Sequence, residues 1–172
     1  MSRPSAQVTG AGTTALLFAT VGCGLGPGRP VVPDEFAAVD ARAAQLVRKV
    51  QIEGGFTVNP RDGTEPTVGY VVNTGDGARL EDARTFFGGS GFASGRAALD
   101  RFVRDNSAAL QADRGLYLGA WYDRAKGRVV LSTVQVVDDR DQALRLGAAR
   151  HQRAVFDLAS GREVPTGESG PG

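Results

Sequence analysis

The sequence predicts an α+β domain in which an antiparallel sheet, built from hairpins, packs against about three helices. Apolar residues recur every three or four positions in three segments, a spacing that is typical of amphipathic helices. Between these segments lie β-branched or alternating runs that are separated by short turns containing Gly or Pro, as in hairpins. Because hairpins pair antiparallel, α+β architecture is favoured over a doubly wound parallel sheet.

Composition narrows the classes of chemistry that are open to the chain. Its 172 residues carry a formal net charge of +1, which provides no overall basic field for nucleic acid. Cys23 is the only cysteine and His151 the only histidine, so intrachain disulfides, cysteine-based zinc sites and multi-histidine metal sites are excluded. We predict neither a metal nor a cofactor.

Three regions are expected: a flexible N-terminal arm at residues 1–33, one α+β domain at 34–165, and a loose C-terminal tail at 166–172. The arm is rich in Gly and Pro and lacks periodicity. An apolar run at 15–22 ends at Cys23 and is too short to span a bilayer. With Arg3 it resembles an export signal with a bacterial lipobox, which implies lipidation of Cys23, although Thr20 departs from that pattern. The alternative is an arm without a signal.

The first helix is predicted to begin at Asp34, whose carboxylate can cap the first turn, and to end at Gly54. One face of this helix is apolar and carries Phe36, Val39, Ala43, Leu46, Val47 and Val50. Strands at 56–59 and 67–73 follow and are expected to form a hairpin around the turn at 60–63.

A short helical turn is predicted at 81–87, followed by a glycine-rich break and a helix capped by Ser94. Strands at 116–122 and 128–137 form a second hairpin. Asp139 caps a third helix, with Gln142 completing a capping-box pattern. Strands at 153–158 and 162–164 form the last hairpin.

Trp121 and Tyr122 are candidate binding residues. Successive side chains of a strand point to opposite faces, so one of the two is expected in the core and the other exposed. An exposed aromatic side chain on a sheet can anchor a partner or stack on a base. The alternative is ordinary half-buried packing.

His151 is a candidate general acid or base, because imidazole titrates near neutral pH. Arg150 and Arg153 flank it and can hold a phosphate, and Tyr122 completes the set under a ribonuclease hypothesis. The alternative is a surface cation at the negative end of a helix.

Two further patterns have ordinary structural explanations that we favour. The glycine-rich segment 88–95 resembles a phosphate-binding loop, but no lysine follows it. The acidic run 138–141 resembles a metal site, but acidic residues at a helix N-terminus account for it.

Several stretches resemble small uncharacterised proteins that are encoded by actinobacterial phages and prophages. They are GFTVNPRDGTEPTVGY at 55–70, YLGAW at 117–121, residues 138–143, HQRAVFDL at 151–158 and EVPTG at 163–167. The resemblance covers residues 55–167 and implies a mobile-element origin without an established activity. Its members carry an aspartate in place of Ser132 and an asparagine in place of His151.

Three functions stay open. We favour a non-enzymatic interaction or accessory protein of phage origin, in the host cytoplasm or the virion, with a protein partner that can add a strand at a hairpin edge. The second is a small metal-independent ribonuclease or toxin-like enzyme that uses His151, Arg150, Arg153 and Tyr122. The third is an exported surface protein anchored to the membrane through Cys23.

Overall fold

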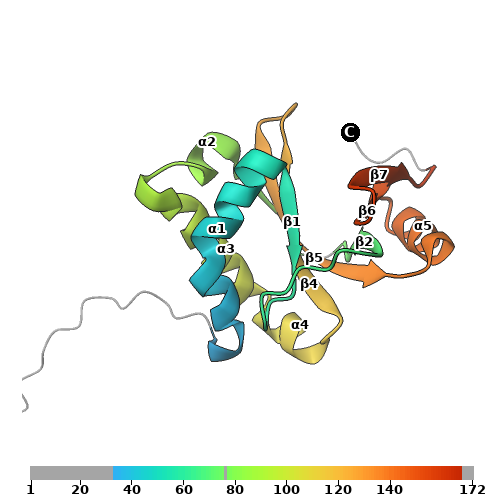
Figure 1. The fold of residues 1–172 in the computed structure, drawn as a ribbon, viewed down its shortest axis with the longest axis horizontal. Coiled ribbons are helices and arrows are strands. Elements are labelled where there is room, and N and C mark those ends of the chain that lie inside the picture. Colours follow the sequence, from blue (N-terminus) through green and yellow to red (C-terminus); the bar gives the residue numbers. More distant parts are fainter. Residues whose placement is uncertain (1–32, 76, 168–172) are drawn as a thin grey trace, which may run out of the picture. The chain divides into compact units, whose positions relative to one another are not determined.

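The computed structural model describes residues 33–75 and 77–167. The helices are α1 (Ala37–Glu53), α2 (Ala83–Phe86), α3 (Ala93–Asp105), α4 (Ser107–Ala112) and α5 (Arg140–Ala149). The strands are β1 (Gly55–Val58), β2 (Tyr70–Asn73), β3 (Arg79–Asp82), β4 (Leu116–Asp123), β5 (Arg128–Val137), β6 (Ala154–Asp157) and β7 (Arg162–Pro165). Figure 1 shows α1 to α3 on one side of the strands and α5 on the other. Short 3₁₀ turns, Asp34–Phe36 and Ser90–Phe92, precede α1 and α3.

The seven described strands form one antiparallel, curled sheet, which confirms the predicted α+β class. Their order is β1-β4-β5-β2-β6-β7, and β3 pairs with the beginning of β5. The predicted hairpins β4–β5 and β6–β7 are confirmed. β5 is the longest strand and contacts β4 along one edge and both β3 and β2 along the other, so it connects the two ends of the sheet.

The first predicted hairpin is wrong. β1 pairs with β4, Phe56 opposite Ala120, whereas β2 pairs with β5 and β6. The turn at 60–63 exists, since the amide of Gly63 donates to the carbonyl of Asn59 at 2.9 Å. The chain that leaves this turn continues to the opposite side of β5 instead of returning along β1. Strand β3 was not predicted either, because Arg79-Leu80-Glu81-Asp82 has only one apolar residue.

Helix α1 has the predicted apolar face. Phe36, Val39, Ala43, Leu46, Val47 and Val50 are all buried. Gly54 ends the helix with a φ of 97°, a left-handed conformation that favours glycine. Asp34 lies in the preceding 3₁₀ turn and makes no capping hydrogen bond with its side chain, so its predicted role is wrong.

Helix α3 begins before the residue that we predicted as its cap. Ser94 is the second residue of the helix, and the N-cap is Phe92, which has no capping side-chain hydrogen bond. The neighbouring Gly95 is buried where α3 meets α1: a Cβ atom there would lie 2.6 Å from the Phe86 carbonyl oxygen and 2.9 Å from the Val47 methyl groups. The glycine-rich segment therefore permits close packing of two helices.

Charged residues attach the segment between β1 and β2 to α1. Arg42 contacts Glu65 at 2.9 Å, and Lys49 contacts the other carboxylate oxygen of Glu65. Burial by itself would raise the pKa of Glu65, but the hydrogen bonds and positive charges of Lys49 and Arg42 outweigh it and lower the pKa below its usual value. The ion pairs fix the path by which the chain reaches β2.

Two separate hydrophobic cores lie on the sheet. The larger core joins α1, α2, α3 and α4 to β1, β4 and the first half of β5. The smaller one joins α5 to β2, β6 and the end of β5, around Val72, Ala143 and Val155. Gly147 lets α5 approach β6, because a Cβ there would lie 2.8 Å from the side chain of Val155.

Candidate functional site

The strand register divides the side chains of the sheet into two faces. The strand residues of both cores share one face, which we call the helix face; among them are Leu118, Leu131, Val72 and Val155. The opposite face, which we call the open face, carries Leu80, Trp121, Val130, Ser132, Val134, Val136, Val71 and Phe156. None of these belongs to either core of the described residues.

The open face is the concave side of the sheet. Both groups of helices pack on the helix face, yet Figure 1 shows α1 and α3 on the opposite side of the sheet from α5. A sheet that holds both groups on one face in this way must curve away from them. The curvature also explains why Val130, Ser132 and Val134 are buried although no helix of the described residues packs over them.

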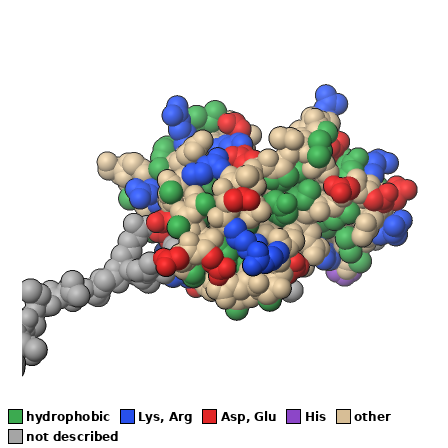
Figure 2. Space-filling view, turned by 60° about the horizontal axis from the view of Figure 1, so that its bottom comes forward, with side chains coloured by type: hydrophobic (Ala, Val, Ile, Leu, Met, Phe, Trp, Pro, Cys, Tyr) green, Lys and Arg blue, Asp and Glu red, His purple; other side chains and the backbone are tan. Residues whose placement is uncertain are grey.

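Large apolar side chains remain accessible on the open face. Trp121 is 51% exposed, Leu80 59% and Phe156 41%. Register brings Trp121 and Leu80 to opposite sides of Val130, while Phe156 and Val136 flank Val71. Figure 2 shows hydrophobic side chains gathered between the part of the molecule built around α1 and α3 and the part built around α5. Trp121 and Leu80 thus form one exposed apolar pair, and Phe156 lies six positions further along β5. Neighbouring exposed apolar side chains on a small protein can mark an interaction site.

Trp121 and Tyr122 divide between the two faces as the alternation of β4 predicts. Tyr122 packs on the larger core, with its ring 5.1 Å from that of Phe87 in an edge-on arrangement and the Arg124 guanidinium 4.9 Å above it. Trp121 projects to the open face. Of the two predicted binding residues, therefore, only Trp121 is available to a large partner surface.

The free edges of the sheet suit a partner strand poorly. Strand β7 ends at Pro165, which lacks the N–H that strand pairing needs. Strand β3 carries three charged residues among its four, and β1 has only four residues before Asn59 and Pro60. Charged residues, proline and short length are the features that keep edge strands from pairing. The structure thus offers the open face as a partner surface in preference to the hairpin edges.

The Arg150 side chain is hydrogen-bonded to two strands of the sheet. Its guanidinium donates to the Asn73 carbonyl and to Oε1 of Gln135, both at 2.9 Å. The side-chain amide of Gln152 pairs with the backbone of Asn73 in the manner of a neighbouring strand, accepting from its N–H at 3.1 Å and donating to its carbonyl. These contacts bind the end of α5 to β2, so Arg150 is not a free phosphate ligand.

His151 ends helix α5. Its φ of 55° is left-handed, its N–H donates to the Ala148 carbonyl, and the following N–H of Gln152 donates to Gly147. These two bonds form the Schellman motif, in which glycine usually holds the position of His151. The His151 side chain is exposed.

The four residues of the ribonuclease hypothesis do not converge. Tyr122 pairs with Val129, whereas Gln135, which Arg150 contacts, pairs with Leu116. Six positions of β4 separate these pairs, a distance of about 20 Å at roughly 3.3 Å per residue. The exposed Arg153 lies before β6, where its carbonyl accepts from Thr166. Of the four residues, only Arg150 and His151 are close together, because they are adjacent in the sequence.

The acidic run 138–141 has the structural role that we favoured. The Asp139 carboxylate accepts from the amide of Gln142 at 2.7 Å and caps α5. No group of three or more His, Cys, Asp or Glu side chains in the described residues is placed to hold a metal ion.

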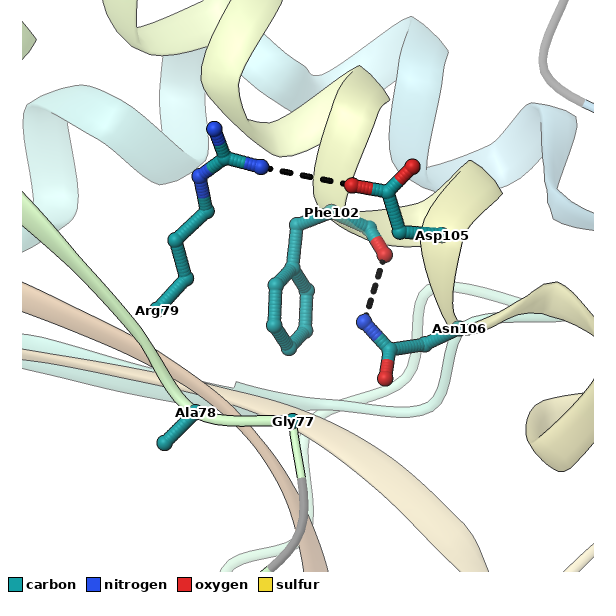
Figure 3. A pocket seen from close by; sticks show the side chains of 6 residues that line it. All are labelled: Gly77, Ala78, Arg79, Phe102, Asp105 and Asn106. Atoms are coloured by element: carbon teal, nitrogen blue, oxygen red, sulfur yellow. Dashed lines mark hydrogen bonds and ion pairs between the residues drawn. The ribbon is translucent and has the colours of Figure 1, made fainter.

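A cavity of about 320 Å³ lies between β3 and the end of α3, and it is lined by Gly77, Ala78, Arg79, Phe102, Asp105 and Asn106 (Figure 3). Arg79 is paired with Asp105 at 3.3 Å and with Glu81 at 2.7 Å. The Asn106 amide donates to the Phe102 carbonyl at 2.8 Å. The polar side chains of the cavity are thus hydrogen-bonded or ion-paired within the protein, and its described lining residues include no nucleophile beside a base.

Two predictions depend on the N-terminal arm, and Cys23 lies outside the described residues. Within residues 33–75 and 77–167, no helix is both long enough and apolar enough to cross a membrane. Comparisons with models of protein families, with curated proteins and with solved structures found no match.

Proposed function

We propose that this chain is a non-enzymatic interaction module that binds a partner protein through the open face. The observation that carries the proposal is the exposure of Trp121 and Leu80, which flank Val130 on the one sheet face that neither core uses. Each of these side chains keeps apolar area in water that a partner can bury, at about 25 cal/mol per Å². Three of the four residues that suggested a ribonuclease, Tyr122, Arg150 and His151, have structural contacts instead.

The proposal includes the setting that the resemblance implies, namely an accessory protein of a phage or other mobile element, in the host cytoplasm or the virion. The small net charge of +1 supports a protein partner over nucleic acid, because nucleic-acid binding needs clustered basic residues to neutralise phosphates.

Matched variants test the proposal. Trp121→Lys places a charge on the open face, and Ile52→Lys places the same charge at a position on α1 that is 61% exposed. Both tagged variants and the wild type are expressed from the natural locus, and co-purifying proteins are quantified by mass spectrometry. We expect a partner that the wild type and Ile52→Lys retain and Trp121→Lys loses. Equal recovery by all three would refute the open face as the binding surface.

A further inference from the structure

Helix α5 and strands β6 and β7, residues 138–167, form what we call the C-terminal unit. We propose that this unit opens from the rest of the sheet as one body while the larger core stays folded. The unit contacts the sheet through the smaller core, the pairing of β6 with β2, and the side chains of Arg150 and Gln152. The proposal is independent of the proposed function, because these contacts do not involve Trp121 or Leu80.

Polar side chains separate the two cores along β5. On the helix face of this strand, the side chains of the larger core end at Leu131, and Val137 packs on the smaller core. Thr133 and Gln135 lie between them, since alternate residues of a strand share one face. The apolar packing is therefore interrupted at this point, and loss of the smaller core does not require loss of the larger one.

The C-terminal unit has far less packing to lose than the rest of the fold. Among the residues that the structure describes, the smaller core has three buried members, Val72, Ala143 and Val155, whereas the larger core has twenty. Strand β6 pairs with β2 over two residues, whereas β4 pairs with β5 over eight. Regions with few buried apolar side chains open at a lower free energy than the whole domain, so we expect this unit to open first.

The side chains of Arg150 and Gln152 hold the unit closed. Both donate to the carbonyl of Asn73 at the end of β2, and the Arg150 guanidinium also donates to Oε1 of Gln135 on β5. Hydrogen bonds from a charged donor are roughly twice as strong as those between neutral groups. We therefore expect Arg150 to contribute a large part of the free energy that keeps the unit on the sheet.

Two consecutive backbone amides distinguish opening of the unit from opening of the sheet. The N–H of Asn73 donates to Oε1 of Gln152, in the C-terminal unit, at 3.1 Å. The N–H of Thr74 donates instead to the Thr133 carbonyl of β5, also at 3.1 Å. Opening of the unit breaks the first bond and leaves the second. Hydrogen exchange of the full chain, followed for each amide by NMR and corrected for unfolded-chain rates, measures the two separately.

In the wild type, we expect Asn73 and the amides of α5 to exchange at least about tenfold faster than Thr74 and the amides of α1. Arg150→Ala should accelerate exchange of Asn73 and α5 by about a further tenfold and leave α1 unchanged. Arg145→Ala is the matched control and should change neither. Arg145 is exposed on the same helix and makes no hydrogen bond or ion pair within residues 33–75 and 77–167.

Equal protection of Asn73, Thr74 and the amides of α1 in the wild type would overturn the proposal, and this comparison requires no variant to fold. Acceleration by Arg150→Ala that is as large in α1 as in α5 would also overturn it, because the domain would then open only as a whole. Equal effects of Arg145→Ala and Arg150→Ala would overturn the role of the Arg150 hydrogen bonds in holding the unit closed.

Discussion

The left-handed conformation of His151 leads to a prediction that is unusual for the only histidine of a protein: its replacement by glycine should stabilise the fold. In this left-handed conformation, steric strain destabilises a residue with a Cβ atom by about 1–2 kcal/mol relative to the right-handed one. Glycine removes that strain but loses about 0.5–1 kcal/mol more conformational entropy on folding. The expected net gain in the free energy of unfolding is ~0.5 kcal/mol, or about 2 °C in Tm for a domain of this size.

The matched control is Gly54→Ala at the end of α1. Gly54 has a φ of 97°, and an added Cβ atom meets no other atom within 4 Å, so the change tests backbone conformation without a clash. We expect it to lower the free energy of unfolding by ~0.5–1 kcal/mol. Urea unfolding followed by circular dichroism measures both variants. A destabilised His151→Gly would refute the assignment of His151 to the helix end.

The same residue separates the structural account from the ribonuclease hypothesis. If His151 only ends α5, then His151→Ala should leave any RNA-cleaving activity of the purified chain unchanged. Cleavage of RNA by the wild type that disappears in His151→Ala would restore the hypothesis despite the distance of Tyr122.

Three further changes test the fold. Glu65→Gln should lower the free energy of unfolding by ~1–3 kcal/mol at pH 7, because it removes the carboxylate that Arg42 and Lys49 share and leaves Lys49 only the more exposed Glu53 at 3.7 Å. Since the pKa of Glu65 is lowered by folding, its stabilising effect is present above the unfolded value of 4.5 and is lost as pH falls through the folded pKa, so wild type and variant should converge in urea titrations below pH 4.5. Gly95→Ala should cost at least ~2 kcal/mol, because the new Cβ atom meets a backbone oxygen at 2.6 Å; an unchanged Tm would contradict the packing of α3 on α1. Asp139→Ala should cost ~1 kcal/mol through loss of the α5 cap, and a neutral result in thermal unfolding would argue against that cap.

Local patterns were sufficient to predict elements whose partners lie nearby in sequence. The apolar spacing from Phe36 to Val50 predicted the buried face of α1, and the turn after Asp123 predicted the β4–β5 hairpin. The alternation of Trp121 and Tyr122 predicted that one would be exposed. Each of these signals comes from residues within a single helix or strand, or from the short turn that follows it.

Long-range pairing was not predictable in the same way. Phe56 and its neighbours pair with β4, about sixty positions later, although the turn at 60–63 has the composition of a hairpin turn. Nothing in the composition of β3 indicates a strand, since its position depends on β5. The open face was missed for the same reason: Leu80, Trp121 and Phe156 come from three separate strands, and only the register and the curvature bring them to one uncovered surface.

The most direct test of the account places a photo-reactive phenylalanine analogue at position 121 and, separately, at position 52, and compares the products after irradiation in living cells. Both positions are exposed, and only the first lies on the open face. The account predicts a crosslinked partner of defined mass from position 121 and none from position 52. Equal labelling at both positions, or labelling at position 52 alone, would contradict it.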